Sequence, residues 1–163
     1  MTRPAHHPTG TPAIVELVAH GIEHTVHPYL HDAAATNYGE EAAAALGIDP
    51  GRIFKTLVVD DAGTLAVAVV PVSSQLDLKA AARALGGKRL TLAVQQQAER
   101  SSGYVAGGIS PIGQRKPLRT VIDCSAFNWC TVYVSAGRRG LQVELAPTAL
   151  VAVTGAITAP IAR

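Results

Sequence analysis

A single lysine lies inside a run of residues that is otherwise typical of a β-strand. The run 53–60 reads IFKTLVVD, and strand alternation places Lys55 on the same face as Ile53, Leu57 and Val59. An amine on such a hydrophobic face can anchor a carboxylate, a phosphate or a ribose oxygen, or it can act with a pKa lowered by desolvation. The alternative is an inward-pointing charge that protects an edge strand from unwanted pairing, and spacing alone favours that alternative.

A glycine-rich segment, GYVAGGISPIG at 103–113, is the second candidate. Its glycines let the backbone approach a ligand closely and offer N–H donors to an anion or an oxyanion. The spacing of Gly108 and Gly113 matches a phosphate-binding P-loop, but Gln114 and Arg115 stand where Lys and Ser/Thr are required. We therefore exclude a nucleotide hydrolase, while a plain turn-rich connection remains an equal alternative.

All six histidines precede residue 32, which raises the question of a metal site. Gly21 interrupts the predicted helix after His20. His27, Tyr29 and His31 alternate along an extended segment, so the spacing implies no tetrahedral ligand set. We expect no metal. The Tyr29 hydroxyl, between two polar neighbours on its face, is either a substrate contact or, more commonly, a half-buried structural group.

The sequence offers no obvious nucleophile. Cys124 and Cys130 have no helix N-terminus that would activate a thiolate, and we expect them to be buried structural thiols. Ser110 lacks the Gly-x-Ser-x-Gly context of hydrolases, and no dinucleotide-binding glycine motif follows a strand. No cofactor is expected.

Clear start and stop signals define the elements that must position these residues. Caps and terminal glycines predict helices over 11–21, 32–46, 77–85 and 95–101, and another that begins near residue 147. Strand-like runs cover 24–31, 53–60, 64–70, 88–94, 118–122, 131–135 and 141–145. Because helices fall between clusters of strands, we predict an α+β fold with a mixed sheet. Residues 1–10 are expected to be a disordered leader and 11–163 a single domain.

Composition narrows the class of protein further. With 163 residues, 48% hydrophobic and 16% charged, the chain is long and apolar enough for one globular domain. Aromatic residues are only 4%, which disfavours a surface of stacking rings for single-stranded nucleic acid. The longest apolar runs are strand-sized and the N-terminus lacks the apolar core of a signal peptide, so we expect a cytoplasmic protein without a membrane span.

The net charge of +2 conceals an uneven distribution. Residues 1–78 carry three Lys+Arg against nine Asp+Glu, whereas residues 79–163 carry eleven against three. Basic pairs are usually just solvated surface. A local basic face is nevertheless suited to an RNA end, and it predicts salt-sensitive binding.

Several segments together resemble a known family. They are HPYLHD at 27–32, TNYGEEAAAALGI, IFKTLVV, VSSQLDLKAAARALGGK, GYVAGGISPIGQ and SAGRRGLQVELAP. In this order, and collinearly from Thr11 to Pro147, they resemble the YbaK/EbsC-type Cys-tRNA(Pro) deacylases. The strand lysine, the GGISPIG loop and the SAGRRG segment make the resemblance specific.

The resemblance implies a trans-editing enzyme that removes cysteine mistakenly attached to proline tRNA, with prolyl-tRNA synthetase as a partner. It implies a fold similar to the editing domain inserted in bacterial prolyl-tRNA synthetases, a mixed, barrel-like β-sheet surrounded by helices. Lys55 and Gly108 then take catalytic roles, Lys55 at the terminal adenosine or aminoacyl end and Gly108 in the loop near the scissile carbonyl. The implied substrate-binding residues are Tyr29, Thr56, Gly107 and Ser135.

One position departs from the family pattern. Relatives commonly show Asp after Gly-Leu, whereas this chain has Gln142, an amide that can donate as well as accept hydrogen bonds. If this position contacts the substrate amine, the amide would alter the substrate preference or the reaction rate. No role is therefore assigned to Gln142.

The family's proposed chemistry fits a protein without a nucleophile, because the thiol of the substrate cysteine can attack its own ester carbonyl. The protein would then orient the reacting groups and place N–H donors at the oxyanion. Attack by water is the competing mechanism. Two other functions stay open: a deacylase for another small residue, such as alanine on tRNA(Pro), and a non-catalytic module that binds aminoacyl-tRNA or a synthetase.

Overall fold

The computed structural model describes residues 10–163, so of the expected leader 1–10 only Gly10 falls within it. The helices are α1 (Pro12–Ala19), α2 (Tyr38–Leu46), α3 (Leu78–Leu85), α4 (Gln95–Ser102) and α5 (Pro147–Thr154), with a short 3-10 helix η1 (Cys124–Asn128). The strands are β1 (Thr25–Pro28), β2 (Phe54–Asp61), β3 (Thr64–Pro71), β4 (Thr91–Leu92), β5 (Thr120–Asp123), β6 (Val132–Arg138), β7 (Leu141–Leu145) and β8 (Ile157–Ala159). The sequence did not predict η1 or β8.

Side-chain caps define the start of three helices. The Thr11 hydroxyl accepts a hydrogen bond from the Ile14 N–H at α1, and the Asp77 carboxylate accepts one from the Ala80 N–H at α3. Helix α3 ends at Gly86, which adopts the left-handed conformation that glycine tolerates best. The capping signals in the sequence therefore placed α1 and α3 correctly.

Helix α2 starts later than predicted. The Asp32 carboxylate accepts a hydrogen bond from the Ala34 N–H at 2.9 Å and the chain turns there, whereas the Asn37 side chain caps the helix through the Glu40 N–H. Two possible capping residues precede the alanine run, and the second one starts the helix. The loop before α2 thereby becomes available to line a site.

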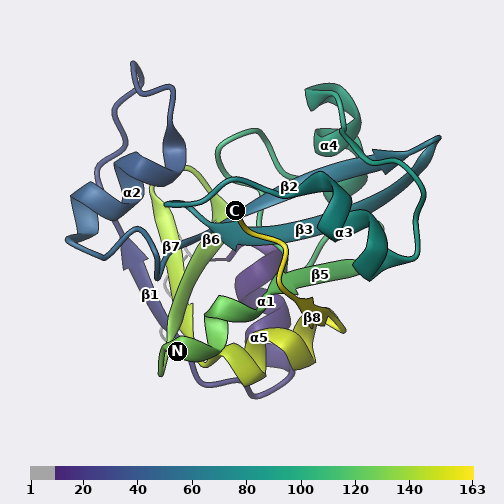
Figure 1. Cartoon of the computed structure of the whole chain (residues 1–163). Helices are drawn as coiled ribbons and strands as arrows, with labels where there is room; N and C mark the ends of the chain where they lie inside the picture. The colour runs from purple at the N-terminus through teal and green to yellow at the C-terminus, as the bar shows by residue number, and fades with distance from the viewer. Residues whose placement is uncertain (1–9) are drawn as a thin grey trace.

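The strands form two sheets (Figure 1). One has five strands in the order β4-β2-β3-β5-β8, with antiparallel and parallel pairs, and the other has three in the order β1-β7-β6, all antiparallel. The mixed α+β architecture is confirmed. The two sheets are joined through a bridge between Ile53 and Tyr133, and the described strands form no closed barrel.

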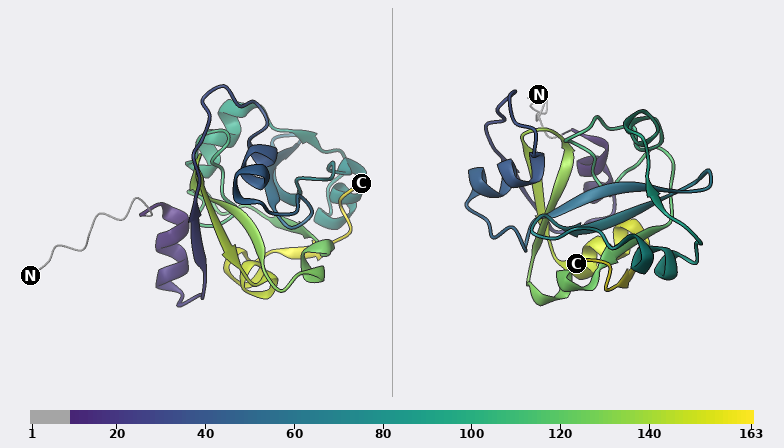
Figure 2. Two further views of the ribbon diagram at one scale, coloured as in Figure 1. Left: turned by 90° about the vertical axis from the view of Figure 1, so that its left-hand side faces the viewer. Right: turned by 45° about the horizontal axis from the view of Figure 1, so that its top comes forward.

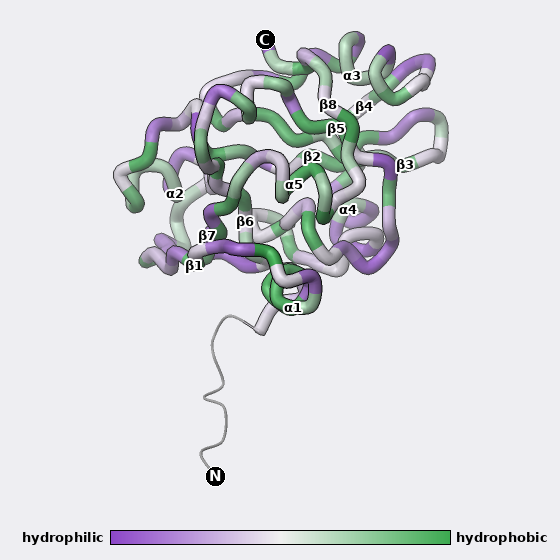
Figure 3. The backbone as a smooth tube through the Cα atoms, turned by 90° about the horizontal axis from the view of Figure 1, so that it is seen from below, coloured by the Kyte–Doolittle hydropathy of each residue, from purple (hydrophilic) through white to green (hydrophobic). Residues whose placement is uncertain are grey.

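Of three clusters of buried hydrophobic residues among the described residues, the two larger ones hold most of the sheets and helices together. The larger contains residues from α1, β6, β7 and α5, including Leu17, Val134, Val143 and Leu150, all fully buried. The smaller lies between the five-stranded sheet and α3. Hydrophobic residues are concentrated along the inner strands (Figure 3). Helix α2 lies at the opposite end of the molecule from α3 and α4 (Figure 2), beside the three-stranded sheet.

The two cysteines contradict the expectation of buried thiols. Both Cys124 and Cys130 are free and exposed. Cys124 begins η1, whose Ala126 is the residue that packs into the core, and Cys130 lies in the turn before β6. A short 3-10 helix that was not predicted therefore explains why the Cys124 thiol faces outward.

The length and hydrophobicity of the helices bear on whether any could cross a membrane. Within residues 10–163, no helix combines the length and the hydrophobicity that a membrane crossing requires.

Candidate functional site

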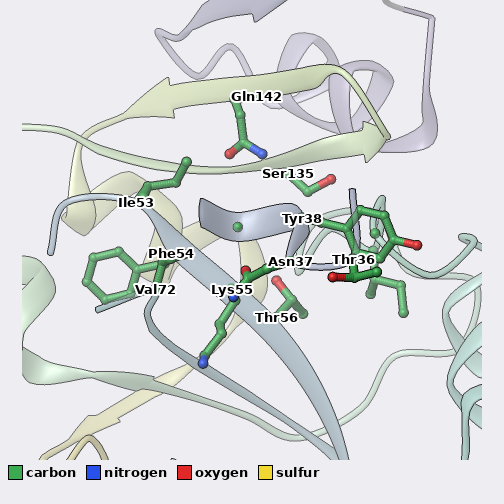
Figure 4. Close-up of a pocket in the computed structure, with 13 residues that line it drawn as sticks. Thr36, Asn37, Tyr38, Ile53, Phe54, Lys55, Thr56, Val72, Ser135 and Gln142 are labelled. Carbon is green, nitrogen blue, oxygen red and sulfur yellow. The ribbon is translucent and has the colours of Figure 1, made fainter. Parts of the chain in front are cut away.

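A cavity of about 500 Å³ lies where the two sheets meet. This volume is within the usual range for small-molecule sites, roughly 300–1,000 Å³. Its walls come from the start of β2, from β6 and β7, from the N-terminus of α2 and from the 107–109 part of the glycine-rich loop (Figure 4). Four of the six predicted site residues line it: Lys55, Thr56, Gly107 and Ser135.

Four consecutive residues border the cavity, Ile53 just before β2 and residues 54–56 at the start of the strand. Strand β4 pairs only with Val59 and Asp60, so on that side the earlier residues of β2 have no strand neighbour among the described residues. The start of β2, unpaired on that side, therefore borders the cavity. Both Lys55 and Thr56 line the cavity, although their side chains point to opposite faces of the strand. Lys55 is half-buried and forms no ion pair with any described residue. Among the described residues, Lys55 is therefore a free cationic residue in the wall of the cavity.

The loop residue Gly107 lies between two side chains at the rim. It has a φ of 83°, and a Cβ there would come within 2.8 Å of the Tyr38 ring and 2.9 Å of Arg139 Nε. Arg139 donates from Nε to the Ala106 carbonyl at 2.7 Å and stacks over the Tyr38 ring at 4.8 Å. These contacts fix the loop against α2 and the turn after β6, and they require glycine at this position.

Gly108 is placed differently from the resemblance-based expectation. It is buried but does not line the cavity, and its N–H donates to the Val105 carbonyl at 2.9 Å. A Cβ at this position would lie 2.6 Å from Arg138 Cα, so glycine is needed for close backbone packing. Because its N–H is already bonded, Gly108 is not an available oxyanion donor in this geometry, and Gly107 is the loop glycine at the cavity.

Strands β6 and β7 contribute one polar side chain each, Ser135 and Gln142, which are directly opposite in the strand register. The register shifts between Ser135 and Arg138, where the Ser135 hydroxyl oxygen accepts the Gly137 N–H at 3.2 Å. Such an irregularity bends a strand and redirects its side chains. The Ser135 hydroxyl proton is then left to donate to a ligand.

Tyr29 lies behind the cavity wall rather than on it. It packs with Ala42, Ala43 and Ile53, and its N–H donates to the Gly140 carbonyl at 2.9 Å. Burial raises the pKa of the Tyr29 hydroxyl, and contacts from the Gly140 backbone and the Gln142 side chain offset part of that rise. Tyr29 therefore stays protonated at neutral pH and adjoins the cavity through Gln142.

Two buried polar atoms of the lining have no hydrogen-bond partner, Thr56 Oγ1 and Gln142 Oε1. Buried polar groups in folded proteins are almost always bonded, so each exception needs an explanation. Figure 4 shows them on opposite sides of the cavity, Gln142 on β7 and Thr56 on β2. A bound molecule with polar groups would satisfy both.

Sequence reasoning missed several contributors to the cavity. Asn37 and Tyr38 line it because α2 begins at Tyr38, which the predicted helix start obscured. Val72, just after β3, lies within 2.7 Å of the Cβ that Gly39 would carry, and both of these residues line the cavity. The TNYG segment was visible in the sequence, but nothing local showed that it would meet β2.

The histidines of the segment before α2 form contacts with carboxylates. His31 Nδ1 lies 2.6 Å from Glu41 Oε1, and His27 Nε2 lies 2.8 Å from Glu144 Oε1. Among residues 10–163, no group of three His, Cys, Asp or Glu side chains is arranged to hold a metal ion.

The chemistry of the lining is one of binding and positioning. It offers an amine, hydroxyls, amides and backbone groups, and it contains no Asp, Glu, His or Cys. The described lining thus has no carboxylate or imidazole that could act as a general base or activate one of its hydroxyls as a nucleophile. It suits a reaction in which the bound molecule or water supplies the nucleophile.

Comparisons with known proteins identify the family of the chain. Residues 31–153 match the family described as the aminoacyl-tRNA editing domain. A protein of Enterococcus faecalis, EbsC, provisionally named a Cys-tRNA(Pro)/Cys-tRNA(Cys) deacylase, is 44% identical over 116 residues, which is 71% of each chain. A proline–tRNA ligase of Shouchella clausii is 35% identical over 74 residues, 45% of this chain but only 13% of that enzyme.

Solved structures show the same relationship. A crystal structure provisionally described as a trans-editing enzyme for prolyl-tRNA synthetase has a TM-score of 0.80 at 27% identity and covers 96% of this chain and 98% of its own. The structure of a hypothetical protein has a TM-score of 0.82 at 29% identity and covers 93% and 99%. The resemblance to the YbaK/EbsC-type deacylases is confirmed, and the chain belongs to the aminoacyl-tRNA editing domain family.

Proposed function

We propose that this protein is a trans-editing deacylase that removes cysteine from Cys-tRNA(Pro). The observation that carries the proposal is the cavity at the sheet junction, which Lys55 lines and whose described lining contains no thiol, and no carboxylate or imidazole to activate a hydroxyl. Membership of an editing family and the name of the 44% identical relative support the same activity.

The substrate thiol is the proposed nucleophile. Its sulfur attacks the ester carbonyl carbon, the bond from that carbon to the ribose oxygen breaks, and the thiol proton passes to the ribose oxygen. Cysteine leaves as a thiolactone, which water then opens. Holding the thiol next to the carbonyl and stabilising the oxyanion are the tasks left to the protein, and both are positional.

Each lining residue has a role in this proposal. Lys55 holds the terminal adenosine or the aminoacyl end, while Thr56 and Ser135 bind the substrate through their hydroxyls. Gly107 replaces Gly108 as the loop residue nearest the carbonyl, because the N–H of Gly108 already donates to Val105. Tyr29 acts indirectly, by contacting the side chain of Gln142.

Four exposed basic residues are the proposed contact for the tRNA acceptor end. Arg138 and Arg139 are exposed in the turn whose backbone packs on Gly108, and Arg115 and Lys116 are exposed at the end of the same glycine-rich loop. None of these four residues forms an ion pair with a described residue, which leaves them available to phosphates. We infer that the protein works in the cytoplasm beside prolyl-tRNA synthetase.

A panel of charged tRNAs tests the proposal. Purified protein is incubated with Cys-tRNA(Pro), Ser-tRNA(Pro) and Ala-tRNA(Pro), and the remaining ester is measured over time. We expect rapid loss of cysteine only, because serine and alanine lack a thiol.

Other outcomes of this panel contradict the proposal in distinct ways. Comparable hydrolysis of the seryl ester would replace the substrate thiol with water as the nucleophile. Loss of alanine but not of cysteine would show a different substrate. Retention of the tRNA without any deacylation would show a binding module.

A further inference from the structure

Gln142 is a buried polar residue in a position that a hydrophobic side chain could fill. It lies on β7 with 7% of its surface exposed, between the two residues Leu141 and Val143, which point into the main core. Strand alternation turns Gln142 to the other face, where it lines the cavity. Its Oε1 atom has no hydrogen-bond partner.

The surroundings of Gln142 leave that oxygen to a ligand. On one side is the hydroxyl of Tyr29, which lies close enough to the amide for its pKa to be affected. Across the strand pair is Ser135, whose hydroxyl oxygen accepts from Gly137. His27, the register partner of Gln142 on β1, has its Nε2 bonded to Glu144 instead. An unsatisfied buried acceptor destabilises a fold, so its retention fits a bound donor.

The charge of the cavity limits what that donor can be. The lining contains one cationic side chain, Lys55, and no carboxylate. An ammonium group bound beside Gln142 would have only neutral dipoles and no carboxylate of the described lining to balance its charge, and burial of an unbalanced charge is unfavourable. An uncharged N–H or O–H donor avoids this cost.

We propose that Gln142 Oε1 accepts a hydrogen bond from an uncharged donor on the α-carbon of the acyl group, so that Gln142 makes the site tolerant of either a neutral amine or a hydroxyl there. This inference rests on the proposed function only in assuming that the cavity takes the acyl end of an adenosine ester. Gln142 is then a specificity-determining residue of the site.

A matched pair of stable ligands tests the inference. They are 3′-amino-3′-deoxyadenosine acylated either with cysteine or with 2-hydroxy-3-mercaptopropanoic acid, whose amide bonds replace the labile ester. Dissociation constants are measured by calorimetry at pH 6.5, where an α-amino group with a pKa near 7.7–8.0 is mostly charged. We expect the wild-type protein to bind the hydroxy ligand at least as tightly as the amino ligand.

Gln142→Glu supplies the missing carboxylate and should reverse this preference, so that the amino ligand binds about tenfold more tightly than the hydroxy ligand, since a hydrogen bond between charged groups is stronger. Gln96→Glu, at an exposed position on α4, adds the same charge away from the cavity and should leave the wild-type preference unchanged. Gln142→Leu should weaken both ligands about tenfold without lowering the melting temperature. It tests the inference even where Gln142→Glu does not fold.

Three results would overturn the inference: a wild-type preference of tenfold or more for the amino ligand, unchanged binding in Gln142→Leu, or no binding of either ligand by the wild-type protein. Deacylation of Cys-tRNA(Pro) is measured separately. If the ligands bind as expected but no deacylation occurs, the proposed function fails while the role of Gln142 stands. If deacylation occurs but neither ligand binds, the reverse holds.

Discussion

Two polar side chains on the same face of β7, only two residues apart, have opposite environments. Glu144 lies at the centre of a hydrogen-bonded cluster: Oε1 is 2.8 Å from His27 Nε2, and Oε2 accepts from the Thr131 hydroxyl at 2.5 Å and from Arg52 Nη2 at 3.3 Å. Gln142 is more deeply buried, yet its Oε1 has no partner. The same strand thus carries one carboxylate with both oxygens bonded and one amide whose oxygen has no described partner.

The difference separates a structural role from a binding role. Glu144 joins β7 to β1, to the residue before β6 and to Arg52, which directly precedes the Ile53 bridge between the sheets. The guanidinium of Arg52 also stacks over the Tyr133 ring at 5.2 Å. This cluster holds the junction together, and the cavity beside Gln142 exists because the junction is held.

Removal of Glu144 should have the largest effect on stability. Glu144→Ala leaves Arg52 and His27 without their carboxylate, and hydrogen bonds to charged groups contribute about 1.5–3 kcal/mol. We expect the free energy of unfolding in urea to fall by about 2 kcal/mol, whereas Glu23→Ala at an exposed position should change it by less than about 0.5 kcal/mol. A loss no larger than that of the control would remove the structural role of the cluster.

Replacement of Gln142 should change the free energy of unfolding in the opposite direction. Gln142→Leu removes an unsatisfied buried acceptor, so the free energy of unfolding should stay the same or rise by about 1 kcal/mol. The rate of deacylation should fall about tenfold, since the ligand loses a hydrogen bond worth about 1.4 kcal/mol. Destabilisation comparable to that of Glu144→Ala would show that Gln142 is structural after all.

A smaller expected effect is the pH dependence of the stability that Glu144 contributes. Hydrogen bonding from Thr131 and His27 lowers the pKa of Glu144 below its ordinary value of 4.5. A lowered folded-state pKa contributes stability that is present above pH 4.5 and is lost as the pH falls through the folded-state pKa. The stability difference between the wild type and Glu144→Gln, measured by urea unfolding, should therefore narrow as the pH falls below 4.5. A difference that does not change with pH would contradict this assignment.

Much of the fold follows from local signals in the sequence. Thr11 with Pro12 starts α1, Asp77 starts α3, and the loop at 61–63 joins β2 and β3 as a hairpin. These features depend on neighbouring residues, so local rules recover them. The start of α2 was misplaced because Asp32 and Asn37 can both cap a helix, and only the contacts around them determine which one does.

The site was harder to predict because its chemistry depends on contacts between distant segments. The sequence identified Lys55, Thr56, Gly107 and Ser135, and the structure brings them to one cavity. It could not show that the Gly108 N–H is already bonded to Val105. Nor could it show that Gln142 is unbonded while Glu144 is bonded, since that contrast depends on Arg52 and His27 reaching β7 from other parts of the chain.

The central claim is that the cavity at the sheet junction, with Lys55 in its wall, is where Cys-tRNA(Pro) is deacylated. The most direct measurement compares the rate constant for deacylation of Cys-tRNA(Pro) in the wild type, in Lys55→Ala and in Lys79→Ala, which removes an exposed lysine of α3. Because Lys55 is the one described cationic residue that lines the cavity, its loss should lower the rate at least about 100-fold, as for other preorganised electrostatic groups, while Lys79→Ala stays within about twofold. A folded Lys55→Ala protein that deacylates Cys-tRNA(Pro) at the wild-type rate would contradict the claim.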